Sequence, residues 1–126
     1  MFWLLGRRSH LSLNNKVLLY KVILRPVWAY GCQLWGCAAD SNIRLVQTFQ
    51  NKILRQISGA EWYVRNTDIH SDLGIKSVKD FIRETAERYE YRLNFHPNAE
   101  AVSLLDPLDE PRRLKRRKPL DIVAVF

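Results

Sequence analysis

The fold of this 126-residue chain depends most on one stretch, Leu18-Leu19-Tyr20-Lys21-Val22-Ile23-Leu24-Arg25-Pro26-Val27-Trp28-Ala29-Tyr30-Gly31-Cys32-Gln33-Leu34-Trp35-Gly36. The stretch is nearly all apolar and aromatic, and both of its charged residues are basic. No acidic residue follows until Asp40. A segment with apolar residues on most of its surface is typical of a helix buried on all sides.

This helix should begin near Leu13, with Ser12 or Asn14 as its N-cap. Apolar residues recur along one face at helical spacing. They are Leu13, Val17, Tyr20, Leu24 and Val27. Because Pro26 lacks an amide hydrogen and its ring clashes with the preceding turn, we expect the helix to kink or restart there.

Three further helices follow from capping signals and apolar periodicity. We expect them from Asp40 to about Ile57, closed by Gly59, around Thr67–Leu73, ended by Gly74, and from about Val78 to Phe95. The last helix pairs Arg83 with Glu87 and Glu84 with Arg88 on its outer face, which favours a supporting role. With no alternating strand pattern, the sequence predicts an all-α fold, a bundle of about four helices in residues 1–96. Residues 97–126 should form a basic, largely irregular tail with several prolines.

The net charge of +7 lies entirely in the first half of the chain. Residues 1–60 hold eight lysines and arginines and one acid, whereas residues 61–126 hold twelve of each sign. Such asymmetry is expected of a surface that binds a polyanion. A basic solvated surface without a specific partner is the alternative, and charge alone does not separate the two.

Two basic clusters are candidates for contact with nucleic acid. One face of the second helix carries Arg44, Thr48, Asn51 and Arg55, is flanked by Lys52, and contains no acid. Bases beside short polar donors suit phosphate oxygens, whereas a merely solvated face would more often show Glu/Lys pairs. The second cluster, residues 112–118, has six bases in seven residues. It indicates a nucleic-acid contact, a nuclear localisation signal or a solvated tail.

No catalytic or metal-binding constellation is evident. Cys32 and Cys37 are the only cysteines, and the three histidines are scattered. Two buried or half-buried thiols in a reducing compartment are therefore expected, with no metal site. No signal peptide or membrane-spanning segment is predicted, so we expect a nuclear or cytoplasmic location and no membrane partner. The abrupt apolar start suggests a chain that begins inside a larger fold.

Several motifs in this order resemble one protein family over nearly the whole chain. They are Trp3-Leu4-Leu5-Gly6, the run from Tyr20 to Gly36, Gln47-x-Phe49-Gln50-Asn51-Lys52-Ile53-Leu54-Arg55, Trp62-Tyr63-Val64-x-Asn66, Ile69-His70-x-Asp72-Leu73, His96-Pro97-Asn98 and the basic cluster followed by Pro119-Leu120-Asp121. Together they resemble the region after the palm in reverse transcriptases (RNA-directed DNA polymerases) of jockey-type non-LTR retrotransposons.

The resemblance implies a helical thumb followed by a C-terminal extension, in a polymerase that copies element RNA. The thumb of that family holds the primer–template. The family's palm binds two catalytic Mg²⁺ ions through carboxylates, including a Phe-Ala-Asp-Asp pattern that this chain lacks. We therefore expect no polymerase activity and no cofactor in this chain alone. A truncated element copy and a fragment of an active polymerase both remain open.

The expected function is non-specific positioning of an RNA or DNA primer–template through its phosphates. The candidate residues are Lys21, Arg25, Arg44, Asn51, Lys52, Arg55, Arg112, Arg113, Lys115, Arg116, Arg117 and Lys118. The alternative is a helical protein–protein interaction module or a non-functional relic, with an exposed apolar face for the missing palm or for self-association. Apolar residues from Phe2 to Leu5 and from Trp28 to Trp35 should then be partly uncovered.

Overall fold

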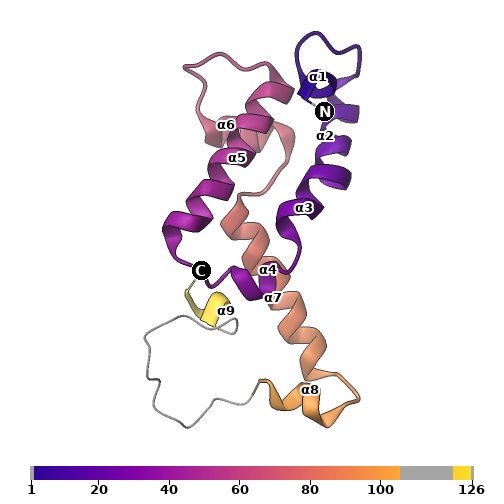
Figure 1. Ribbon diagram of the computed structural model, residues 1–126, viewed down its shortest axis with the longest axis vertical. Coiled ribbons are helices and arrows are strands. Elements are labelled where there is room, and N and C mark those ends of the chain that lie inside the picture. Colours follow the sequence, from indigo (N-terminus) through magenta and orange to yellow (C-terminus); the bar gives the residue numbers. More distant parts are fainter. Residues whose placement is uncertain (1, 106–120, 126) are drawn as a thin grey trace. The chain divides into compact units, whose positions relative to one another are not determined.

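A computed structural model describes residues 2–105 and 121–125, and these residues form helices and turns without any strand (Figure 1). The predicted all-α class is confirmed, although the helices are shorter and more numerous than a bundle of about four. No helix among the described residues has the length and apolar character needed to cross a membrane. The basic cluster at residues 112–118 lies outside the described residues.

The described chain divides into two compact units. The first unit combines residues 1–30 with residues 40–78. It contains α1 (Phe2–Leu5), α2 (Leu13–Leu19), the π-helix η1 (Tyr20–Leu24), α3 (Arg25–Ala29), α5 (Asp40–Ser58) and α6 (Asn66–Leu73). The second unit combines residues 31–39 with the described residues from Lys79 onward. It contains α4 (Cys32–Trp35), nearly all of α7 (Val78–Asn94), α8 (Ala99–Ser103) and α9 (Asp121–Val125). The predicted boundary between residues 96 and 97 stays a prediction.

The first predicted helix restarts at Pro26, as expected. The amide of Arg25 donates to the Tyr20 carbonyl five residues back, so the preceding turn is a π turn. Pro26 then lies in the first turn of α3, where the absence of its amide hydrogen costs little. The positive φ of Gly31, 64°, separates α3 from α4.

The expectation that this first helix is buried on all sides is wrong for the chain described here. Tyr20 is fully buried and Leu24 half-buried, but Leu18 is 58% exposed and Val22 63%. Val27, predicted on the buried face, is 78% exposed. The π turn contains one residue more than an α turn, so Val27 is rotated away from the face that Tyr20 and Leu24 share.

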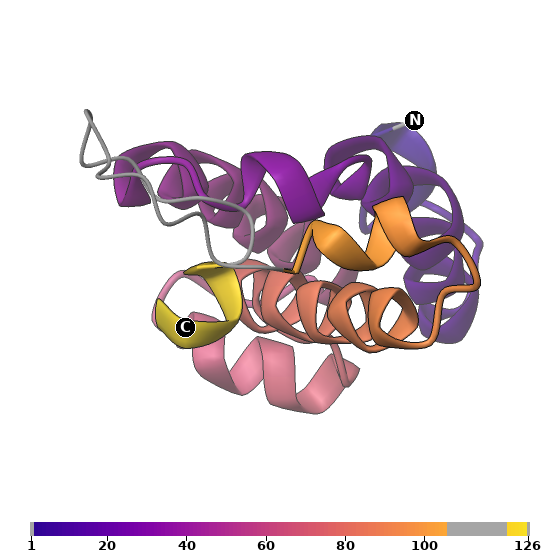
Figure 2. The same ribbon diagram turned by 90° about the horizontal axis from the view of Figure 1, so that it is seen from below.

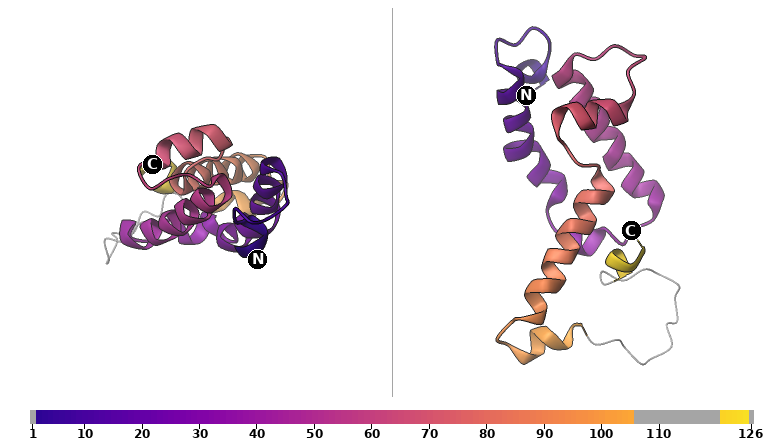
Figure 3. Two further views of the ribbon diagram at one scale, coloured as in Figure 1. Left: turned by 90° about the horizontal axis from the view of Figure 1, so that it is seen from above. Right: turned by 180° about the vertical axis from the view of Figure 1, so that it is seen from behind.

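The core of the first unit forms where α5 and α6 lie side by side and α1 and α2 pack on α5 (Figure 3). Its buried members are Leu5, Tyr20, Ile53, Leu54, Ile57, Ile69 and Ile75. The long helix α5 ends at Gly59 and α6 at Gly74, both with a φ of 62°. These ends match the glycine signals in the sequence, because glycine adopts the left-handed conformation without a steric cost.

The second unit is built along α7, after which the chain turns back into α8 (Figure 2). Asn98 caps α8, since its side-chain oxygen accepts from the amide of Glu100 at 2.9 Å. On the buried side of α7, Ile82 lies against Gly36, and a Cβ at Gly36 would be 2.5 Å from the Ile82 Cγ2 atom. The short helices α8 and α9 were not predicted.

Candidate nucleic-acid interface

The outer side of α5 carries Arg44, Thr48 and Lys52, which are four residues apart and all exposed. Residues at this spacing lie on one side of a helix. Asp40 is the only acid in α5, at its first position. The hydroxyl of Thr48 donates to the Arg44 carbonyl at 2.9 Å, so it bonds to its own helix. This side therefore presents two long cations, with a single acid, Asp40, one turn before Arg44.

Arg55, also predicted on this face, is engaged inside the first unit. Its guanidinium donates to the carbonyls of Glu61 and Val64, both at 2.7 Å, and to the side-chain oxygen of Asn66 at 2.8 Å. These contacts tie α5 to the segment that leads into α6. The planar fork of arginine suits several acceptors at once. The guanidinium of Arg55 thus holds the fold, which its position on the predicted stripe did not reveal.

The predicted contact residue Asn51 belongs to a network between α5 and α6. Its side-chain oxygen lies 2.9 Å from Gln47 Nε2 and 2.9 Å from His70 Nε2. The other ring nitrogen of His70 lies 2.8 Å from the Ile75 carbonyl. Because both nitrogens of His70 face oxygen acceptors, this side chain joins α5, α6 and the segment after α6.

Two backbone groups fix the orientation of the glutamine amides in this network. The Val78 amide can only donate, so the Gln47 atom 2.8 Å from it is the side-chain oxygen. The Lys76 carbonyl can only accept, so the Gln50 atom 3.0 Å from it is the side-chain nitrogen. Gln50 is 1% exposed and also donates to the hydroxyl of Tyr20 at 3.0 Å. The network therefore fixes the register of α5 against its neighbours.

Lys21 and Arg25, the two bases predicted on the first helix, are half-buried in and next to η1. Tyr20, which comes directly before Lys21, is fully buried. Burial raises the pKa of the Tyr20 hydroxyl, whereas the bond from Gln50 and the charge of Arg25 act in the opposite direction. The structure thus places Lys21 in η1 and Arg25 in α3, which follow α2, the helix that packs on α5.

The segment between α5 and α6 contains features that sequence reasoning did not single out as a site. Trp62 is 87% exposed and Tyr63 is 69% exposed. Arg7, from the turn after α1, donates to the Gly59 carbonyl and lies 3.4 Å from Glu61. The available signal was a pair of bulky aromatics between Gly59 and Asn66, in a segment where turn residues are expected.

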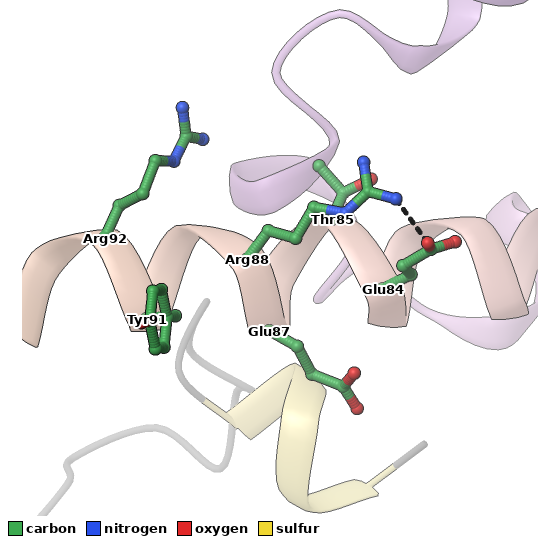
Figure 4. Close-up of a pocket in the computed structure, with 6 residues that line it drawn as sticks. All are labelled: Glu84, Thr85, Glu87, Arg88, Tyr91 and Arg92. Atoms are coloured by element: carbon green, nitrogen blue, oxygen red, sulfur yellow. Dashed lines mark hydrogen bonds and ion pairs between the residues drawn. The ribbon is translucent and has the colours of Figure 1, made fainter.

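Charges on α7 are paired, as its sequence predicts. Arg83 Nε lies 3.9 Å from Glu87, and Arg88 forms an ion pair with Glu84. Figure 4 shows the Arg88 guanidinium turned back toward Glu84 along the helix. A shallow pocket here is lined by Glu84, Thr85, Glu87, Arg88, Tyr91 and Arg92. Since acidic and basic side chains both line the pocket, this surface should attract a polyanion less strongly than the outer side of α5 does.

The two cysteines are unpaired, with Cys32 buried and Cys37 half-buried, as predicted. Burial raises the pKa of the Cys32 thiol, so the thiol stays protonated and unreactive. The Cys37 thiol donates to the Leu34 carbonyl at 2.9 Å. Among residues 2–105 and 121–125, no group of three or more His, Cys, Asp or Glu side chains is arranged to hold a metal ion.

Comparison with curated proteins gives matches along nearly the entire chain. The chain is 51% identical over 123 residues to a probable RNA-directed DNA polymerase from transposon X-element of Drosophila melanogaster. It is 43% identical to RNA-directed DNA polymerases from mobile element jockey in Drosophila funebris and Drosophila melanogaster. These alignments cover 97–98% of this chain but only 13–14% of each relative. No family model and no solved structure matches.

Proposed function

Because this chain is homologous to a segment of the RNA-directed DNA polymerases of jockey and X-element, we propose that it positions nucleic acid without carrying out chemistry itself. The contact would be made to phosphates by the outer side of α5. The observation that carries the proposal is the exposed pair Arg44 and Lys52 on a helix whose only acid is Asp40, at its start. Lysine and arginine contacts to phosphates supply most of the sequence-independent affinity for nucleic acid.

The remaining predicted residues divide into two groups in this proposal. Lys21 and Arg25, together with the basic cluster at residues 112–118, add positive charge to the same chain and would strengthen non-specific attraction. Arg55 and Asn51 act indirectly, because their side chains hold α5 in place through Glu61, Val64 and His70. Any catalytic Mg²⁺ of a complete polymerase would be bound outside this chain.

The test is a titration of labelled duplex at several salt concentrations. Wild-type affinity should lie around 10⁻⁴ to 10⁻⁶ M near physiological salt, without sequence preference. The double variant Arg44→Ala/Lys52→Ala should lower the slope of log affinity against log salt by about two, one for each lost phosphate contact. Because neither side chain makes a buried contact, its folding should be unchanged.

The matched control is Arg83→Ala/Arg88→Ala, which removes the same charge from α7. Each of these arginines has an acid one helical turn away, so duplex binding should hardly change. Equal losses from the two double variants would mean that only net charge matters. The assignment of α5 would then be wrong.

A second candidate function, contact with a protein, is favoured by an apolar stripe along α2, η1 and α3. It consists of Leu18, Val22 and Val27, which are 58%, 63% and 78% exposed, and it is followed just after α3 by Tyr30, which is 88% exposed. Exposed apolar groups that share one side of a helix mark interaction surfaces. An association through this stripe should persist at high salt, and Val22→Asp/Val27→Asp should abolish it in sedimentation analysis. Duplex binding should weaken steeply with salt in the same protein.

A further inference from the structure

The segment between α5 and α6 contains a tight turn with two aromatic residues at its corner. The amide of Val64 donates to the Glu61 carbonyl at 3.1 Å, which closes a four-residue turn with Trp62 and Tyr63 in its central positions. These positions usually hold Pro, Gly, Asn, Asp or Ser. Trp62 and Tyr63 are among the more exposed large hydrophobic side chains of the described residues, at 87% and 69%. Folding of the turn therefore gives no reason for two large rings here.

The backbone of this aromatic turn, residues 61–64, is held at both ends by arginines. Arg55 donates to the carbonyls of Glu61 and Val64, each at 2.7 Å. Arg7 donates to the carbonyl of Gly59 just before the turn. A turn fixed in this way displays its rings in one arrangement before any ligand arrives, which reduces the entropy lost on binding.

The rings themselves are arranged so that flat surfaces stay open. Trp62 and Tyr63 meet edge to face, with centroids 5.9 Å apart and an interplanar angle of 84°. In this geometry the rings are not stacked on one another. At least one ring therefore has both faces open to a flat partner.

The charge around the turn is positive. Arg7, Arg8 and Arg65 are exposed, and Arg7 lies 3.4 Å from Glu61, the acid of this segment. Arg7 is engaged with Gly59 and Glu61, so Arg8 and Arg65 are the guanidinium groups that would contact a polyanionic backbone while the rings contact its bases. Basic and aromatic side chains together form the usual surface for single-stranded nucleic acid.

We propose that the aromatic turn binds unpaired nucleobases of a single-stranded RNA or DNA by stacking on Trp62 and Tyr63, with Arg8 and Arg65 near the phosphates. This site is separate from the duplex contact proposed for α5 and does not depend on it. A protein partner for two exposed aromatics is the competing explanation. The exposed Arg8 and Arg65 favour nucleic acid, because an uncharged partner surface would offer these two charges no counterpart.

The chain contains its own control for exposed aromatics. Tyr91 and Phe95, on and just after α7, are 66% and 73% exposed and have centroids 4.9 Å apart. Glu84, Glu87 and Glu90 are on the same helix. This pair therefore has a similar aromatic area in a region with as many acids as bases.

The experiment measures binding of the full chain to a labelled single-stranded oligonucleotide and to an abasic oligomer of the same length. Both have the same phosphates, so any difference reports the bases. Wild type should bind the base-containing strand more tightly and show quenched tryptophan fluorescence. Trp62→Ala/Tyr63→Ala should weaken that binding by roughly fivefold to a hundredfold per stacked base. Binding to the abasic strand should not change.

The control variant Tyr91→Ala/Phe95→Ala should bind both strands as wild type does. Because all four rings are exposed, the variants should fold normally, which circular dichroism checks. Equal wild-type affinity for the two strands would overturn the proposal. So would equal losses in the two double variants, or a self-association removed by Trp62→Ala/Tyr63→Ala while strand binding stays intact. Failure of the α5 variant in the duplex titration would leave this result unaffected.

Discussion

The two units of the chain differ in charge and in the kind of contact that holds each together. The first unit has ten lysines and arginines against four acids, whereas the described residues of the second have four against six. Polar side chains join the elements of the first unit: Gln47, Gln50, Asn51, Arg55 and His70 all bond across elements. In the second unit, close apolar contact at Gly36 brings α4 against α7 and α9.

This difference matters for assigning function from sequence. In the first unit, a polar or basic residue on a helix can either bond to another element of the fold or face solvent, where it could bind a ligand. Both kinds of residue alternate along α5. In the second unit, the charged residues of α7 pair with one another and leave less net charge for a ligand. In the first unit, composition alone therefore does not distinguish the residues that hold the fold from those that face solvent. The contacts of each side chain are needed for that.

The largest effect is expected at Gln50, the buried amide of the first unit. Gln50→Ala removes bonds to Tyr20 and Lys76 and leaves Gln47 without one acceptor. It should lower the free energy of unfolding by about 3 kcal/mol, from lost packing and unsatisfied polar groups. Urea denaturation measures this. Thr48→Ala on the exposed side of the same helix should change stability by less than about 0.5 kcal/mol. Similar losses in Gln50→Ala and Thr48→Ala would contradict a stabilising role for the hydrogen-bond network.

A smaller effect is expected in the second unit at Gly36. A Cβ there would lie 2.5 Å from the Cys32 carbonyl and from Ile82, and 3.2 Å from Ile122. Gly36→Ala should cost about 2 kcal/mol, because overpacking shifts backbone and side chains. At Gly31, where nothing lies within 4 Å, only the positive φ of 64° matters. Gly31→Asn should therefore cost less than about 1 kcal/mol, since asparagine tolerates this conformation. A larger loss of stability from Gly31→Asn than from Gly36→Ala would contradict the tight apolar contact at Gly36.

The smallest effect concerns alkaline pH, with one reporter in each unit. Burial raises the pKa of Tyr20 and of Cys32 above their ordinary values of 10.0 and 9.0. A raised pKa means that the native state favours the protonated group, so this stability is present at neutral pH and is lost as pH rises through and above those values. Denaturation between pH 8 and pH 11 should show a weaker alkaline loss in Tyr20→Phe and in Cys32→Ala. Unchanged slopes in both variants would count against the buried environment of these groups.

Much of the helical layout follows from local signals in the sequence. Gly59 and Gly74 end α5 and α6 as predicted, and Pro26 restarts the first helix. The apolar face of α5 and the ion pairs of α7 also follow from periodicity. These features depend on residues close in sequence, so they are visible without a structure.

The candidate site was less predictable because some of its side chains form hydrogen bonds with residues far apart in sequence. Arg44 and Lys52 are exposed as expected, but Arg55 and Asn51 form hydrogen bonds with partners 6 to 19 residues away. The burial of the first helix was also overestimated, since periodicity assumes a regular α-helix and η1 interrupts it. The contribution of the residues at 112–118 stays a prediction.

The π turn at η1 has a consequence for how this chain tolerates insertions and deletions. Each helical residue adds about 100° of rotation, and the extra residue in a π turn absorbs about one such step. That step changes the side on which a residue after the turn, such as Val27, lies relative to a residue before it, such as Leu18. Deleting one residue within Tyr20–Leu24 would convert the turn to a plain α turn. Either Tyr20 and Leu24 or the residues of α3 would then turn by about 100° away from the side they now face, so a one-residue length change here should be harder to accommodate than most point substitutions.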